Sequence, residues 1–336
     1  MKKILSIFAA LIALSACHDI DEWDNDARGN FDALWNILDA HYCFFDEKGI
    51  DWDDVYRRYS AKVSPTMTSE ELFLVCSDML DELKDGHVNL SSAFNTSYYR
   101  KWWSDYPHNF DLRTIEDNYL HYNYRSMNAC TFDMLTENVG YLRISTFSSP
   151  IGDGNLDNIL NYLSSAKGLI IDVRDNGGGD VTVVETFCRR FIFSHTLVGY
   201  ISHKTGPGHS DFSKPMEIYY DPAPAGRLMW SKPVVVLTNR GSYSATNTFV
   251  SVMKSFPQVT IMGDCTGGGS GMPYSSELPN GWGVRFSACP MLDAKGVCTE
   301  NGIMPSEGFK IDISEADRAA YRDTILDTAI NFLTGK

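Results

Sequence analysis

A short apolar strand that runs through a serine-bearing turn into a helix most constrains the fold of this chain, at residues 232–256. Four consecutive apolar residues, 234–237, are typical of a strand buried on both faces. Asn-Arg-Gly at 239–241 ends the run, and apolar residues then recur at helical spacing from Ala245 onward. A serine hydroxyl in this turn lies beside a helix N-terminus, where free backbone N–H groups and the dipole favour negative charge. That position suits a nucleophile whose product is an oxyanion.

Alternating strand and helix patterns begin at residue 139 and continue past this unit. Such alternation predicts an α/β core. The predicted strands are 139–144, 169–173, 234–237 and 259–262, and the predicted helices are 156–163, 181–193, one after Ser244 and a closing helix at 315–333.

Helical patterns dominate the region before this core. Thr68 and Glu71 predict a capping box at the start of one helix, and we expect a helical cap domain. The next segment is rich in aromatic residues and predicts two or three short strands, and its about 45 residues are too few for an inserted peptide-binding domain of ordinary size, about 100 residues. The predicted regions are a signal peptide at 1–17, an acidic tether at 18–28, the helical cap at 29–90, the aromatic-rich strand segment at 91–137 and the α/β core at 138–336.

The first seventeen residues, MKKILSIFAALIALSAC, have the form of an export signal. Lys2 and Lys3 form the positive region, and the apolar run at 4–14 is too short to span a membrane. The ending Leu-Ser-Ala-Cys resembles a bacterial lipoprotein processing box, in which the cysteine, here Cys17, is lipidated. An ordinary secretory signal cut elsewhere is the alternative. We expect a lipid-anchored protein of the cell envelope, at the periplasmic face of the outer membrane or the cell surface.

Charge and cysteine content exclude two classes of function. The formal net charge is −14 and no basic stretch occurs, so nucleic-acid binding is not expected. No Cys-x-x-Cys pair occurs, so we expect no zinc site. Seven cysteines follow Cys17, an odd number that leaves at least one unpaired, and Cys289 and Cys298 could bridge a local loop.

A second motif, GLIIDVRDNGGGD at 168–180, is a strand that ends in three glycines. Glycine allows backbone conformations that bring N–H groups close to a ligand. A phosphate-binding loop fails because neither G-x-G-x-x-G nor Gly-Lys-Ser/Thr is present. An oxyanion hole made of backbone N–H groups and a plain tight turn both stay open for this segment.

Two further segments carry side chains suited to acid–base chemistry. His87, in LKDGHVNL at 83–90, could accept a proton from a serine hydroxyl near neutral pH. Glu300, in VCTENGIMP at 297–305, could orient or charge-stabilise an imidazole or a serine. Taken singly, a satisfied surface histidine and a solvated loop carboxylate are the alternatives.

Taken in their order along the chain, four segments resemble the tricorn core protease and C-terminal processing peptidase family of serine proteases. They are the segment around His87, the glycine motif, the serine-bearing turn and the segment around Glu300. The resemblance covers about residues 31–313 and is carried by IIDVRDNGGG, VVVLTNRGSYSA and GDCTGGGSG. It implies a helical cap, a crotonase-like α/β spiral core without a separate inserted peptide-binding domain, and hydrolysis of peptides or unfolded proteins by a serine. Hydrolysis by a serine needs neither a metal nor an organic cofactor.

The resemblance also implies roles for individual residues. Ser244 matches the nucleophile, and Ser242 then resembles a turn or N-cap residue. Backbone N–H groups of Ala245 and of Gly178, with Gly177 as its neighbour, match the oxyanion hole.

The general base places the chain in one branch of that family. The processing-peptidase branch has a lysine about 25 residues after the serine, but position 269 is glycine, so a Ser/Lys dyad is absent. The tricorn branch uses a histidine with a supporting serine and glutamate, and His87 and Glu300 match two of these. Gly86 stands where tricorn has the serine, so the support of His87 is unassigned.

Three other functions are alternatives to a serine peptidase. An α/β-hydrolase elbow requires G-x-S-x-G, and the trailing glycine is missing. An acyl-CoA enzyme of the crotonase type conflicts with export. A non-catalytic ligand- or peptide-binding lipoprotein stays open, because relatives of this fold include retinoid carriers and the aromatic residues of 98–124 could line a groove. A serine-reactive fluorophosphonate probe separates the enzyme from the binder.

Overall fold

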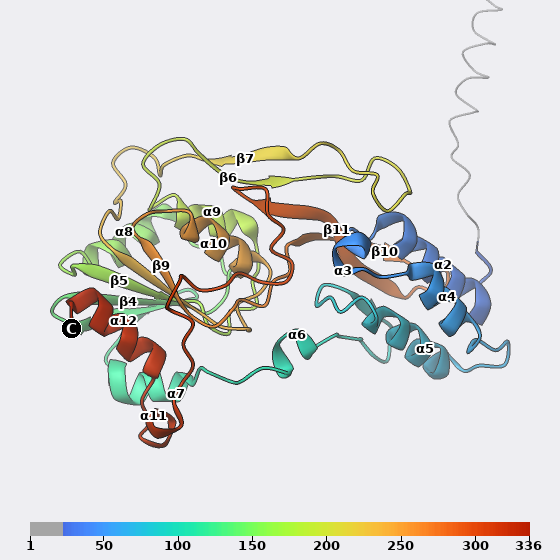
Figure 1. Ribbon diagram of the computed structural model, residues 1–336, viewed down its shortest axis with the longest axis horizontal. Coiled ribbons are helices and arrows are strands. Elements are labelled where there is room, and N and C mark those ends of the chain that lie inside the picture. The colour runs from blue at the N-terminus through green and yellow to red at the C-terminus, as the bar shows by residue number, and fades with distance from the viewer. Residues whose placement is uncertain (1–22) are drawn as a thin grey trace, which may run out of the picture.

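The computed structural model describes residues 23–336, so Cys17 and the predicted export signal lie outside the described residues. Figure 1 shows a group of N-terminal helices beside a strand pair, and a sheet flanked by helices. The helices are α2 (Ala27–His41), α3 (Phe45–Lys48), α4 (Trp52–Ser60), α5 (Ser69–Asp81), α6 (Lys101–Ser104), α7 (Leu112–Ile115), the π-helix η1 (Glu116–Leu120), α8 (Asp153–Tyr162), α9 (Val181–Cys188), α10 (Ala245–Lys254), α11 (Glu315–Ala319) and α12 (Thr324–Thr334). The strands are β1 (Asn89–Ser91), β2 (Arg125–Met127), β3 (Cys130–Thr136), β4 (Val139–Ile144), β5 (Gly168–Asp172), β6 (Thr196–Ile201), β7 (Met216–Tyr220), β8 (Val234–Thr238), β9 (Val259–Gly263), β10 (Gly271–Glu277) and β11 (Gly283–Asp293).

The six-stranded sheet has the order β2-β3-β4-β5-β8-β9. Strands β4, β5, β8 and β9 run parallel, and β2 and β3 add antiparallel pairs at one edge. The register places Ile170 opposite both Tyr141 and Val235, so these three side chains share one face. Parallel strands covered on both faces need continuous apolar runs. The predicted strands and the α/β core are thereby confirmed.

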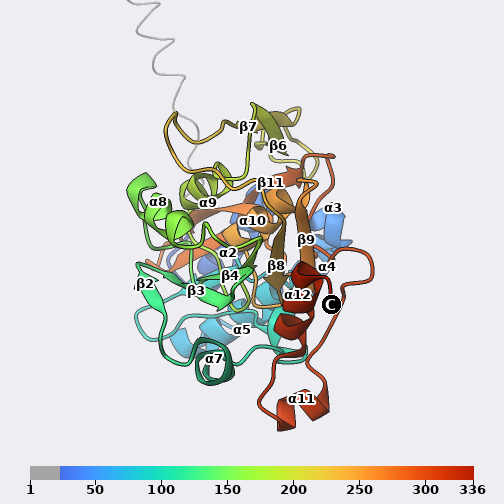
Figure 2. The same cartoon turned by 90° about the vertical axis from the view of Figure 1, so that its left-hand side faces the viewer.

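Helices cover both faces of this sheet. Successive strand residues point to opposite faces, so Ile171 and Val236 pack with α8, α9 and α10 while Ile170 and Val235 pack with α12. Figures 1 and 2 show α11 at one end of the molecule and the β6–β7 pair at the opposite end. The resulting three layers hold the loops after β5 and β8 on a rigid support.

The N-terminal helices form a second apolar cluster with strands from far along the chain. A five-stranded sheet has the order β1-β11-β6-β7, and β10 pairs with β11. Phe73 of α5 contacts Trp282 in the turn between β10 and β11, with ring centroids 5.5 Å apart. The predicted capping box is present, because Thr68 and Glu71 bond each other's backbone N–H groups. Thus β10 and β11, from the predicted core region, pack with the predicted cap helices.

Two predicted helices differ from the structure at their C-terminal parts. The helix predicted at 181–193 ends at Cys188, because the next residues form tighter turns and the buried Arg190 guanidinium pairs with Asp153 and Asp157. The helix predicted at 315–333 is two helices, α11 and α12. The break falls before Asp323, whose buried side chain caps α12.

The predicted strand segment at 91–137 is only partly strand. Strands β2 and β3 occupy its last third, but the aromatic part contains the short helices α6 and α7 and the π-helix η1. Trp102 of this part packs on Tyr243, whereas Tyr98, Trp103, Tyr106 and Tyr122 are exposed. The abundance of aromatic residues here therefore did not indicate strand formation.

Candidate active site

Ser244 lies in a strained turn between β8 and α10. Its φ of 60° and ψ of −123° are uncommon for a residue with a side chain, and such conformations cost of order 1–3 kcal/mol. Ser244 is the N-cap of α10, yet its hydroxyl caps no backbone N–H group. Ser242 is a turn residue, whose Oγ donates to Val173 O at 2.8 Å and accepts from Asn239 N at 3.2 Å. The strained turn leaves the Ser244 hydroxyl available to another side chain.

That side chain is His87. The distance between His87 Nε2 and Ser244 Oγ is 2.8 Å, across 157 residues of sequence. His87 lies between α5 and β1, on the side of the N-terminal helices, while Ser244 belongs to the six-stranded sheet. Its imidazole is buried and its ring lies 5.0 Å from that of Tyr243. The site therefore forms where the two regions of the molecule meet.

Ser287 and Asp85 support the other side of the imidazole. His87 Nδ1 lies 3.5 Å from Ser287 Oγ, and Ser287 Oγ donates to Asp85 Oδ2 at 2.8 Å. Asp85 Oδ1 also accepts the backbone N–H of His87 at 2.8 Å. Both Ser287 and Asp85 are fully buried. The Asp85 carboxylate thus holds the histidine backbone directly and its ring through the Ser287 hydroxyl.

Lys48 connects Asp85 with Glu300. Lys48 Nζ lies 2.9 Å from Glu300 Oε1 and 3.7 Å from Asp85 Oδ2. Glu300 Oε2 accepts the Ser270 N–H at 2.8 Å. Within the described chain, Glu300 makes no hydrogen bond to His87 or Ser244. The structure therefore brings Ser244 and His87 into contact and places Glu300 further along the same buried network.

Burial and charge shift the pKa values of these groups in different directions. Burial lowers the pKa of His87 to about 4, despite the opposing effect of Asp85. Burial would raise the pKa of Asp85, but Lys48 and His87 hold it below its ordinary value. Burial and the charge of Asp85 raise the pKa of Glu300 to about 7, although Lys48 opposes this. At neutral pH the imidazole is therefore uncharged and Asp85 is ionised.

The oxyanion hole predicted from the sequence consists of the N–H groups of Ala245 and of Gly178, with Gly177 as its neighbour. A Cβ on Gly178 would lie 2.9 Å from both Ala245 N and Ser244 Cβ, so this glycine packs directly against the serine turn. Gly178 has a φ of +103° and its N–H donates to Asn176 Oδ1 at 3.0 Å. Among the residues that the structure describes, the N–H groups of Gly177 and Ala245 have no acceptor. Ala245 adjoins Ser244 in the chain, so its uncommitted N–H is available beside the serine.

The absence of a side chain at Gly86 has a packing reason. A Cβ at this position would lie 2.5 Å from Trp102 Nε1 and 2.9 Å from the Tyr243 hydroxyl. Trp102 and Tyr243 stack with ring centroids 4.0 Å apart. A serine at position 86 would therefore displace this aromatic pair.

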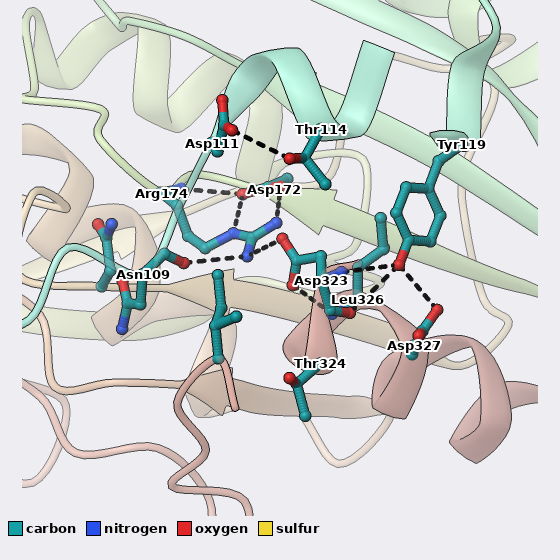
Figure 3. A network of polar contacts seen from close by, with 12 residues as sticks. Asn109, Asp111, Thr114, Tyr119, Asp172, Arg174, Asp323, Thr324, Leu326 and Asp327 are labelled. Atoms are coloured by element: carbon teal, nitrogen blue, oxygen red, sulfur yellow. Dashed lines mark hydrogen bonds and ion pairs between the residues drawn. The ribbon is translucent and has the colours of Figure 1, made fainter. Parts of the chain in front are cut away.

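A buried ion-pair network fixes the segment that leads into the glycine loop. Arg174 Nη2 lies 2.6 Å from Asp172 Oδ2, and Arg174 Nη1 lies 2.7 Å from Asp323 Oδ2. Figure 3 shows the guanidinium between Asp172 on β5 and Asp323 at the start of α12. Since all three residues are buried, the C-terminal helix is tied to the loop that carries Gly177 and Gly178.

Sequence reasoning missed Asp85, Ser287 and Lys48. Asp85 had a local signal, because an aspartate two residues before a histidine can accept its backbone N–H, as here. Ser287 lies on β11, 200 residues from His87, and Lys48 lies on α3. No spacing rule in the sequence connects these two residues to the histidine.

Other features of the described residues carry less chemical information. Cys289 and Cys298 are free thiols rather than a disulfide, as are the other cysteines from Cys43 onward. Over residues 23–336, no group of three potential metal ligands is clustered. In the same range, no helix has both the length and the apolar character to cross a membrane.

The model of peptidase family S41 matches residues 138–308, slightly more than half of the chain. The chain belongs to peptidase family S41. A model of the tricorn protease C1 domain also matches this S41 chain, at residues 24–81, which cover most of the N-terminal helices. The family predicted from the four motifs is thereby confirmed.

Solved structures and curated relatives support the same assignment. A crystal structure of a candidate peptidase from Parabacteroides merdae is 49% identical to the S41 chain, with a TM-score of 0.87 over 92% of this chain and 97% of that one. Mature CPAF shares the fold alone, at 13% identity with a TM-score of 0.70 over 93% of this chain and 98% of CPAF. A carboxyl-terminal-processing protease of Synechocystis is 26% identical over 203 residues, 59% of this chain and 44% of that protein. The S41 chain thus spans less than half the length of this curated relative.

Proposed function

We propose that this S41 chain is an exported serine peptidase that hydrolyses peptide bonds through a Ser/His acyl-enzyme mechanism. The contact of 2.8 Å between Ser244 Oγ and His87 Nε2, in a strained turn at a helix N-terminus, carries the proposal. A serine hydroxyl needs such a neighbouring base to become a nucleophile. Membership of the S41 family supports peptides as the substrate class.

Acylation starts with neutral His87. Its Nε2 takes the proton of the Ser244 hydroxyl as Oγ forms a bond to the substrate carbonyl carbon. The carbonyl π electrons move to oxygen, and the Ala245 N–H donates to that oxyanion together with the Gly178 N–H, which exchanges its bond to Asn176 Oδ1 for this one. When the C–N bond breaks, His87 gives its proton to the leaving amine. The acyl group then remains on Ser244.

Deacylation repeats the same steps with water. His87 accepts a proton from water while the water oxygen attacks the acyl carbon, and the proton then returns to Ser244 as the acid leaves. The burial that lowers the pKa of His87 keeps the imidazole available as a base at neutral pH. The Ser287 hydroxyl can accept a hydrogen bond from Nδ1–H while its own hydrogen is donated to Asp85, which fixes the tautomer that leaves Nε2 free.

Asp85 and Ser287 therefore support the His87 imidazole, a role that Gly86 cannot fill because it has no side chain. The ionised Asp85 stabilises the imidazolium that forms during each step. Glu300 acts at longer range, by holding Lys48 against Asp85 and by fixing the Ser270 backbone. In this mechanism Asp85, Ser287, Lys48 and Glu300 are positioning residues.

The cellular location is proposed from the sequence alone. Cys17 is the lipidation site, and the acidic residues after it form a tether. Metabolic labelling with a palmitate analogue should modify the wild-type protein and not a Cys17→Ala variant. Equal labelling of the two proteins would contradict the anchor.

Replacing Ser244 with alanine tests the proposed activity. We expect Ser244→Ala to reduce turnover of a cleaved peptide by about 10³-fold or more, with an unchanged circular dichroism spectrum. Ser251→Ala, on the same helix α10, is the matched control and should keep full turnover. A mixed peptide library read by mass spectrometry supplies the substrate. Equal turnover by the Ser244→Ala variant would eliminate the mechanism.

A further inference from the structure

A cavity of about 310 Å³ lies beside the proposed catalytic residues. Lys84, Lys101 and Arg240 bring positive charge to its lining, and Tyr99, Trp102 and Tyr106 form aromatic walls. A cavity of this size matches the lower end of small-ligand pockets, which run from about 300 to 1,000 Å³. It is therefore large enough for a peptide side chain or a chain end.

Four cations line this cavity, and among residues 23–336 three of them have no ion-pair partner, whereas Lys48 is paired with Glu300. In the described part of the chain, Lys84, Lys101 and Arg240 form no ion pair. Arg240 donates instead to two backbone carbonyl oxygens, Trp102 O and Thr266 O, each at 2.9 Å. Uncompensated positive charge is unexpected on a chain with a formal net charge of −14. A local excess of cations in an acidic protein attracts an anionic ligand.

Acidic residues in the lining do not cancel this charge. Glu300 reaches the cavity, but its carboxylate is paired with Lys48 at 2.9 Å. Asp105 is the other acidic residue of the lining and is exposed. Among the lining residues, one unpaired carboxylate therefore faces three unpaired cations, and Asp81 and Glu82, outside the lining, partly offset the charges of Lys101 and Lys84.

The walls hold Arg240 in a fixed position. Its guanidinium lies over the Tyr106 ring, 4.1 Å from the centroid, and its Nε is held by Trp102 O. A planar guanidinium fixed in this way is suited to a carboxylate, which it can bind through two parallel hydrogen bonds. The site is thus pre-organised rather than formed by mobile lysines alone.

The cavity shares walls with the catalytic site. Gly86 and Tyr243 line it, and they are the chain neighbours of His87 and Ser244. An extended peptide advances about 3.3–3.6 Å per residue. A peptide held at Ser244 can therefore reach the cavity within a few residues.

We propose that this cavity binds a carboxylate of the peptide substrate and so selects acidic substrates. The inference rests on the proposed peptidase function. The carboxylate comes either from an aspartate or glutamate side chain or from the C-terminus of the peptide, and the experiment below distinguishes these sources. The aromatic walls pack against the apolar part of the bound residue.

Peptide binding to the Ser244→Ala protein tests the proposal without cleavage. Isothermal titration calorimetry measures the affinity for two pairs of peptides. The glutamate pair has a C-terminal amide and differs only in one glutamate or glutamine side chain. The free-end pair differs only in a free or an amidated C-terminus. The pocket variant is Lys84→Gln/Lys101→Gln/Arg240→Gln, and the matched control is Lys167→Gln/Lys214→Gln/Arg57→Gln, which removes three exposed cations outside the cavity. We expect one carboxylate to bind about fivefold tighter than its neutral form, a preference that the pocket variant loses and the control keeps.

The result also identifies the ligand. A preference in the glutamate pair assigns an internal acidic side chain, and a preference in the free-end pair assigns the C-terminus. Equal affinity within both pairs, or a preference that survives in the pocket variant, would overturn the proposal. A carboxylate preference without any hydrolysis by the wild-type protein would leave this site standing and reject the peptidase function.

Discussion

The low pKa of His87 makes a specific prediction for the pH dependence of catalysis. An ordinary histidine has a pKa of 6.5, whereas burial lowers the pKa of His87 to about 4. At about pH 5.5 an ordinary histidine would be about 10% neutral, but His87 would be about 97% neutral and able to accept a proton. The acid limb of kcat/KM should therefore have its midpoint near pH 4 to 5.

The assay measures kcat/KM for one cleaved peptide between about pH 3.5 and 8, since this parameter reports the free enzyme. The pKa of Glu300, raised to about 7, adds a second and shallower inflection if its charge holds Lys48 in place. Glu300→Gln should remove that inflection and leave the lower limb unchanged. A midpoint near 6.5 in both proteins would refute the argument that burial controls the base.

Stability changes in the same pH window and must be measured beside activity. The folded-state pKa of His87 lies below its unfolded value, so the unfolded chain binds more protons between about pH 4 and 6.5. The stability from this group is fully present above about 6.5 and is lost as the pH falls towards 4. Circular dichroism at each pH separates loss of fold from protonation of the base.

Three further variants test the supporting contacts. Ser287→Ala should lower kcat by about 10- to 100-fold with KM nearly unchanged in steady-state assays, because His87 Nδ1 loses its partner; an unchanged kcat would exclude this support. Gly178→Ala should lower both activity and melting temperature because its Cβ would lie 2.7 Å from Tyr243 O at a positive φ. The control Gly154→Ala adds its Cβ in open space within α8, so it should keep the activity and should not lower the melting temperature. Arg174→Met should lower the free energy of unfolding in urea by about 3–5 kcal/mol, against less than about 1 kcal/mol for the exposed Arg57→Met control, and equal losses would contradict the buried network.

The sequence predicted the parts of the fold that local pattern controls. The apolar run before Asn239 and the helical spacing after Ser244 define β8 and α10, because a buried parallel strand and an amphipathic helix each leave a distinct pattern. The capping box at Thr68 is local in the same sense. The break before Asp323 was missed because its cause is a tertiary ion pair with Arg174, which no local pattern encodes.

The candidate site likewise contains some residues that local motifs indicate and others that only tertiary packing brings together. Ser244, His87 and the glycines follow recognisable motifs, so the sequence located them. Ser287 and Lys48 reach the histidine network only because β11 and α3 pack beside it. The glycine at position 86 indicated that no side chain there supports His87. Only the packing of Trp102 and Tyr243 explains why that position has no side chain.

Covalent labelling of the purified protein tests the central claim most directly. A fluorophosphonate probe reacts with a serine activated by a neighbouring base, and peptide mass spectrometry locates the adduct. We expect one adduct on Ser244, absent from Ser244→Ala and formed far more slowly in His87→Ala. No adduct on the folded wild-type protein, or an adduct on another serine, would contradict this claim.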